Sequence, residues 1–167
     1  MASSLRLVEN VRGDADGGGA VRRSRRGYLD FVVDGAPLGD KFASVLGGAN
    51  MPADYVPVLV LDWPIGFPAD DYGRLVGELS APLPDDRVPL YICAECGDLG
   101  CGGVTAVIER TADTVVWRDF GYQNDYEPFD SDDVLPCVGP IMFDQHAYLS
   151  ALSGFKDRWP TADRLRE

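Results

Sequence analysis

The chain has 167 residues, of which 46% are hydrophobic and 25% are charged. These proportions suit one globular domain with a buried core and exclude whole-chain disorder and a collagen-like chain. The 15 basic and 27 acidic residues give a formal net charge of −12, which argues against generic binding to nucleic acid or to anionic membranes, because both carry fixed negative charge. A basic protein is the partner that such a field favours.

The N-terminal residues differ in composition from the rest of the chain. Apolar residues at positions 5, 7 and 11 could form a short strand, but the glycine-rich stretch 13–19 offers little to bury and is followed by the arginine cluster 22–26. We therefore predict a flexible N-terminal segment over residues 1–27. Residues 1–5 lack the charged start and apolar run of a secretion signal, and no stretch approaches the ~20 apolar residues of a membrane span, so we expect a cytoplasmic protein.

From Tyr28 the pattern becomes regular. Residues 28–33 alternate with the period of a strand and end at an Asp-Gly turn. Apolar residues 38, 42, 45 and 46 recur at helical spacing before a pair of glycines. The compact apolar run 56–61 predicts a buried strand, with Pro57 near its start or on an edge because proline cannot donate to a ladder.

The middle of the chain contains a helix and then a hairpin. Pro68 and the carboxylates after it open a helix with Tyr72, Leu75, Val76 and Leu79 on its buried side. Residues 90–93 are expected to form a strand. The alternating run 104–110, a turn at 111–113 and the run 114–120 predict an antiparallel hairpin.

A final helix is predicted to begin after Asp144, a good N-cap, and to reach about Phe155 with a buried stripe of residues 147, 148, 151, 152 and 155. These elements predict an α+β fold: a mainly antiparallel sheet that includes the 104–120 hairpin, with two or three helices packed on one face. We expect a single domain over residues 28–157 and a frayed tail over 158–167.

The most distinctive segment carries three cysteines within nine positions. Cys93 and Cys96 have the two-residue spacing that lets both sulfurs face one tetrahedral centre, and the following glycines let Cys101 join them. Cys137 could supply a fourth sulfur. The sequence thus allows a structural zinc site at these four residues, although the second Cys-x-x-Cys of a zinc ribbon is missing.

Two other interpretations of this segment remain open. It could support thiol redox chemistry, although Glu95 and Asp98 would raise the pKa of a neighbouring thiol. It could also be a tight glycine-rich turn in which cysteines simply pack where larger residues would not fit, with no cofactor at all.

Established catalytic patterns are missing from the sequence. Neither phosphate-binding glycine motif occurs, and neither do the nucleophile elbow and the His-Glu-x-x-His motif. His146 is the only histidine, and the stripe of the last helix predicts that it is exposed. We therefore favour a protein that is not an enzyme and assign no catalytic residue.

An acidic stretch with interspersed aromatic residues follows the hairpin. Rigid rings beside carboxylates are typical of a patch for a basic protein partner, and the carboxylate spacing does not match an EF-hand. The alternative is that the rings belong to the edge of the core. The candidate partner-binding residues are Tyr122, Asp125, Tyr126, Glu127, Phe129 and Asp130.

The order of several motifs resembles a family of small uncharacterised bacterial proteins, mainly from actinobacteria. The resemblance lies in the Cys-Gly-x-x-Gly-Cys turn at 96–101, the Trp-x-Asp-Phe strand end at 117–120 and the Gly-Pro-x-x-Phe-Asp segment at 139–144. It covers roughly residues 28 to 155 and departs at Ile141, where the family pattern has an aromatic residue. Some relatives carry an oxidoreductase label, but the resemblance implies no defined reaction or cofactor.

The sequence therefore predicts a small acidic protein that binds a protein partner, in the manner of an immunity protein or an antitoxin. The alternative is a zinc- or thiol-dependent enzyme or redox protein centred on Cys93, Cys96 and Cys101.

Overall fold

The computed structural model describes residues 1–13, 15–16, 22–43, 54–63, 67–136 and 138–158. The fold is α+β, as the sequence predicted, with two main antiparallel sheets and three α-helices among the described residues. No helix in these ranges is long and apolar enough to cross a bilayer. Cys137 and the predicted tail from residue 159 onward lie outside the described residues.

The larger sheet has five strands in the order β10-β9-β8-β7-β6. Its centre is the predicted hairpin, formed by β8 (Gly103–Arg110) and β9 (Thr114–Gln123). On one side lie β7 (Arg87–Cys93) and β6 (Tyr55–Pro57), and on the other lies β10 (Ile141–Asp144). β10 was not predicted, because its four residues directly precede a helix and look like that helix's entry.

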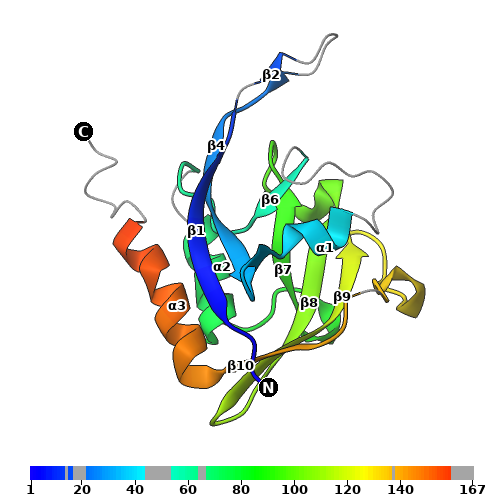
Figure 1. The fold of residues 1–167 in the computed structure, drawn as a ribbon. Helices are drawn as coiled ribbons and strands as arrows, with labels where there is room; N and C mark the ends of the chain where they lie inside the picture. Colours follow the sequence, from blue (N-terminus) through cyan, green and yellow to red (C-terminus); the bar gives the residue numbers. More distant parts are fainter. Residues whose placement is uncertain (14, 17–21, 44–53, 64–66, 137, 159–167) are drawn as a thin grey trace.

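The smaller sheet has the order β1-β4-β5, from β1 (Leu5–Arg12), β4 (Arg26–Val33) and β5 (Ala36–Pro37). β1 pairs with β4 over its whole length, from Leu5 opposite Val33 to Arg12 opposite Arg26. Residues 5–12, which the sequence assigned to a flexible segment, are therefore part of the sheet. Backbone pairing orders them although most of their side chains are not buried. A short hairpin of β2 (Ala15–Asp16) and β3 (Arg22–Arg23) extends this ribbon (Figure 1).

Two isolated bridges join the edges of the sheets. Ser3, just before β1, pairs with Phe143 of β10, and Val60, just after β6, pairs with Tyr28 of β4. The strands therefore form a barrel-like wall around one core. Inside it, the ring of Phe31 meets those of Trp117 and Tyr91 edge-on, with centroids 5.4 and 6.0 Å apart.

The helices are α1 (Gly39–Ala43), α2 (Phe67–Val76) and α3 (Gln145–Arg158). α2 and α3 pack on each other, with the ring of Tyr72 stacked on Phe155, and α3 lies along β1, whereas α1 lies apart from them (Figure 1). The Asp144 carboxylate accepts the Ala147 N–H at 2.8 Å, as expected of the predicted cap. Two residues predicted to lie on the buried side of a helix do not: Leu79 lies beyond the end of α2, and Ala147 is exposed.

Candidate functional site

The cysteine turn, residues 93–102, connects β7 to β8. It contains a short 3-10 helix, η2 (Leu99–Cys101), which the Asp98 carboxylate caps by accepting the Gly100 N–H at 2.7 Å. Two glycines in left-handed conformations allow the chain to turn this sharply. Gly97 has φ +71 and lies so close to the Trp63 ring that a Cβ would come within 2.9 Å of it. Gly102 has φ +79, and a Cβ there would overlap the Tyr122 hydroxyl.

This turn brings together three of the four predicted sulfur ligands. The Sγ atoms of Cys93, Cys96 and Cys101 lie within 4.8 Å of one another, and those of Cys96 and Cys101 are 3.3 Å apart. Cys93 is partly buried, and the other two are exposed. Within the described ranges this group could hold a metal ion.

The environment of the turn distinguishes the sulfurs. Burial acts to raise the pKa of Cys93, but the backbone N–H groups of Cys96 and Glu95 point at its sulfur and lower the pKa overall. Burial raises the pKa of Cys96 to about 12, with Cys101 and Cys93 adding to the effect. The backbone of the turn therefore favours the thiolate form of Cys93, whereas Cys96 stays protonated until a cation replaces its proton.

Neighbouring strands hold the cysteine turn in place. Glu95 forms an ion pair with the buried Arg12 of β1 and accepts the Ser24 N–H at 2.9 Å. Arg26 donates from Nε to the Ala94 carbonyl at 2.8 Å. No local pattern could have indicated these contacts, because they join residues about 70 to 80 positions apart, such as Arg12 and Glu95 at a separation of 83.

Two tyrosines connect the turn to the rest of the larger sheet. The Tyr122 hydroxyl donates to the Cys101 carbonyl at 3.2 Å. The Tyr55 hydroxyl lies 3.2 Å from that of Tyr122, and Tyr55 is paired in register with Cys93. Tyr122, predicted to face a partner, is thus engaged in supporting the cysteine turn.

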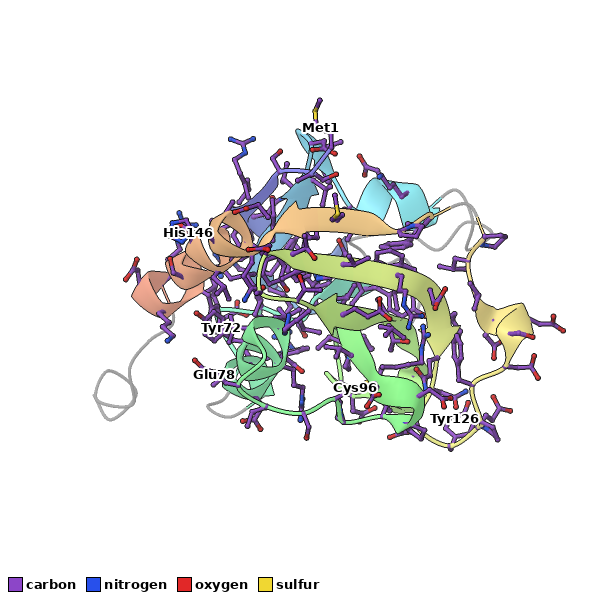
Figure 2. All side chains as sticks on the ribbon, turned by 90° about the horizontal axis from the view of Figure 1, so that it is seen from below. Met1, Tyr72, Glu78, Cys96, Tyr126 and His146 are labelled. Atoms are coloured by element: carbon purple, nitrogen blue, oxygen red, sulfur yellow. The ribbon has the colours of Figure 1, made fainter. Side chains whose placement is uncertain are left out.

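His146 and the cysteines lie in different parts of the molecule. His146 is exposed on α3, as predicted, and Figure 2 shows it well separated from Cys96. The structure therefore brings no imidazole to the described thiols, and a Cys-His nucleophile pair is not formed.

The acidic loop, residues 122–133, is an ordered structure with many internal hydrogen bonds. The Asn124 side chain accepts the N–H groups of Tyr126 and Glu127 at 3.2 and 2.8 Å. Further on, Asp130 caps the 3-10 helix η3 (Ser131–Asp133) in a capping box, and the Asp132 N–H and Ser131 hydroxyl lower the Asp130 pKa.

The predicted partner-binding residues divide into two groups. Phe129 lies on the buried guanidinium of Arg87, 3.7 Å from ring centroid to Cζ, and Asp130 caps η3, so both have structural roles. Asp125, Tyr126 and Glu127 are exposed, Tyr126 to 70%. Figure 2 shows Tyr126 at the edge of the molecule.

Comparison of the chain with models of protein families, with curated proteins and with solved structures gives no match. The resemblance to the actinobacterial family stays a prediction, and the function has to be inferred from the geometry of this chain.

Proposed function

We propose that this chain is a zinc-binding protein with Cys93, Cys96 and Cys101 as ligands. The observation that carries the proposal is the convergence of three sulfurs within 4.8 Å of one another. Thiolates bound to one tetrahedral zinc at about 2.3 Å lie about 3.8 Å from one another. The Cys96–Cys101 separation of 3.3 Å and the 4.8 Å limit bracket that value, so small side-chain rotations would suffice.

Zinc fits this donor set better than an iron–sulfur cluster does. Iron–sulfur clusters are usually held by four thiolates, whereas the described part of the turn provides three. Zinc accepts three protein sulfurs with a fourth ligand from water, a partner or another protein group. A backbone that directs N–H groups at a ligand sulfur, as at Cys93, is the kind of outer support that orients metal ligands.

The proposed role of the metal is to fix the cysteine turn between three strands. The turn already contacts β1 through Glu95, β9 through Tyr122 and β6 through the pairing of Tyr55 with Cys93. Zinc would add a covalent-strength link within the turn, so its removal should loosen these contacts first and should leave the core around Trp117 intact.

Elemental analysis of the protein, purified under reducing conditions without a chelator, tests this proposal. We expect close to one zinc per chain, and at least about tenfold weaker zinc affinity in each of Cys93→Ser, Cys96→Ser and Cys101→Ser. Protein without metal, whose thiols all react freely with a labelling reagent, would contradict the proposal. Bound copper or iron in place of zinc would support the three cysteines as a metal site but would contradict zinc as the metal.

Cys137→Ser is the matched control, because it removes a cysteine that lies outside the described residues. Full zinc retention in this variant limits the protein sulfurs to the three of the turn. Loss of zinc assigns Cys137 as the fourth ligand and makes the site a closed structural one.

A second function, docking of a basic protein, is favoured by the exposure of Tyr126. Its ring is 70% exposed and stands between the carboxylates of Asp125 and Glu127 on a loop that internal hydrogen bonds hold in shape. A preorganised aromatic residue flanked by acids has the composition of an interface anchor and loses little entropy on binding.

Alanine at Asp125, Tyr126 and Glu127 together tests the docking function. The variant should fold normally but capture less of a basic partner in a pull-down, and its zinc content should not change. Arg118, partly exposed on β9, provides a control with its own alanine variant. Equal capture by the triple variant and the native chain would contradict this placement of the interface.

A further inference from the structure

A second candidate site is a cavity of about 140 Å³ between β4, α1, β6 and β7. Its lining includes three tyrosines, Tyr28, Tyr55 and Tyr91, and two aspartates, Asp30 and Asp40. We call it the Tyr91 cavity. Tyr28 and Tyr91 are buried and form its inner end, whereas Asp40 is exposed at its mouth.

The cavity is negatively charged. Asp30 and Asp40 both line it, and no lysine, arginine or histidine is among its lining residues in the described ranges. Burial raises the pKa of Asp30 to about 6, Asp40 adds to the rise, and the Phe31 N–H opposes it. No positively charged residue of the described lining compensates the carboxylate of Asp30, and a cationic ligand would supply that charge.

The Tyr91 hydroxyl is an unsatisfied polar group at the inner end of the cavity. Tyr91 is only 2% exposed, and its oxygen has no hydrogen-bond partner among the described residues. Tyr91 is itself one of the residues that line the cavity. A buried polar group without a partner is costly and calls for an explanation.

A divalent metal does not fit this arrangement. Among the described residues, the group of three or more side chains that could hold a metal is the cysteine turn, and Asp30 and Asp40 are not part of it. Aromatic walls and carboxylates are instead the chemistry that recognises an organic cation, because the ring faces attract positive charge and the carboxylates accept N–H donors.

We propose that the Tyr91 cavity binds a small organic ammonium ion. Its N–H groups donate to the carboxylates of Asp30 and Asp40 and to the Tyr91 oxygen, while its alkyl part lies against the tyrosine rings. A cavity of about 150 Å³ accommodates benzene, so about 140 Å³ suits a ligand of about six non-hydrogen atoms. This site shares no ligand residue with the proposed zinc site.

Titration with n-butylammonium, followed by backbone amide chemical shifts of the full chain, tests the proposal. We expect saturable shifts at residues around the cavity. The neutral analogue 1-butanol has the same length and no charge, and it should bind at least about tenfold more weakly. Equal binding of the two probes, or shifts that do not saturate, would overturn the proposal.

Variants locate the binding. Asp30→Asn should weaken n-butylammonium binding by about tenfold or more, and Asp40→Asn, at an exposed position, should do so even if Asp30→Asn folds poorly. Asp125→Asn makes the same change in net charge in the acidic loop and should leave the affinity unchanged. Equal losses in all three variants would show a general charge effect and would refute the site.

Tyr91→Phe provides a readout that a purely structural tyrosine would not give. Removing an unsatisfied hydroxyl should raise the Tm of the ligand-free protein and at the same time weaken n-butylammonium binding severalfold. A variant that is less stable, or that binds the probe as the native chain does, would contradict the role of Tyr91. Zinc content is measured on the same samples, so failure of the zinc proposal is distinguishable from failure of this one.

Discussion

Two buried polar residues of β7, Arg87 and Tyr91, have opposite environments. Arg87 donates from Nε to Thr105 Oγ1 at 3.0 Å and to Gln123 Oε1 at 3.2 Å, and from Nη2 to the Asp119 carbonyl at 2.6 Å. The ring of Phe129 covers its guanidinium. Four positions along the strand, the Tyr91 hydroxyl has no hydrogen-bond partner among the described residues, and Tyr91 lines a cavity.

This difference separates polar groups that serve the fold from those that serve a ligand. Arg87 finds its partners within the chain and contacts the acidic loop through Phe129, so its role is architectural. The Tyr91 cavity has acceptors and charge that the chain leaves unpaired. A protein can tolerate an unsatisfied buried polar group when a bound molecule supplies its hydrogen-bond partner, and this is the physical basis for the ligand we propose.

The largest effect is expected from breaking the Arg87 network. Arg87→Met should lower the free energy of unfolding by about 3 kcal/mol, because Gln123, Thr105 and the Asp119 carbonyl lose their donor inside the core. Urea denaturation monitored by tryptophan fluorescence measures this. A loss below about 1 kcal/mol would show that the network contributes little.

The pH dependence of stability tests the cavity end of β7. Because the pKa of Asp30 is about 6 in the folded chain, above the usual 3.8, the folded state holds this proton more tightly than the unfolded state. Its contribution is therefore full below about pH 4 and is lost as the pH rises through about 6. The contribution of Asp71 to stability is also lost as the pH rises, since burial raises its pKa to about 6 despite its ion pair with Arg74.

Asp30→Asn isolates this contribution, because asparagine is uncharged at every pH. Between about pH 4 and pH 7 the native chain should lose about 1–2 kcal/mol more stability than the variant, allowing for screening of a partly exposed carboxylate. The comparison is made in the presence of a chelator, so that metal release cannot contribute. Parallel pH profiles for the two proteins would be incompatible with the burial of Asp30.

Tyr91→Phe should stabilise the ligand-free chain by about 1 kcal/mol, which is a rare direction for a substitution in a core. Differential scanning calorimetry of the chelated protein would show a higher Tm. Tyr148→Phe is the contrasting variant, because the Tyr148 hydroxyl donates to the Leu75 carbonyl at 2.8 Å. Removing this hydroxyl should lower the Tm. A loss of stability in both variants would remove the distinction between the two hydroxyls.

The smallest effect is expected at an exposed cation of the neighbouring strand β9. Arg118 forms ion pairs with Glu109 and Asp119, but its side chain is 36% exposed. Arg118→Met should cost less than about 1 kcal/mol and less still in high salt. A loss as large as that of Arg87→Met would mean that charge, and not burial, sets the importance of arginines here.

Local patterns predicted much of the fold. The alternation of residues 104–120 gave the hairpin, and Asp144 marked the start of α3. The sequence allowed a short strand at positions 5, 7 and 11, but it did not predict that β1 pairs with β4 over eight residues, because that pairing depends on backbone hydrogen bonds between strands with many exposed side chains. β10 was missed because a four-residue strand at the edge of a sheet has too few positions to show a period.

The candidate sites divide in the same way. The cysteine spacing predicted the trio at 93, 96 and 101, because these ligands are close in sequence. Asp30, Asp40, Tyr55 and Tyr91 come from four separate elements, and nothing local in the sequence indicates that they share a cavity. Arg87 could have been noticed as a charged residue at the head of an apolar run, but its partners are 18 or more positions away.

The contact between the hydroxyls of Tyr55 and Tyr122 has a thermodynamic consequence. Tyr55 belongs to the wall of the cavity, and Tyr122 donates to the backbone of the cysteine turn, so two binding events would share one pair of side chains. Linkage then imposes reciprocity: whatever factor a metal applies to amine affinity, an amine applies equally to metal affinity. The hydrogen-bonded pair of phenols would thus be one route by which this protein could make uptake of one ligand conditional on the other.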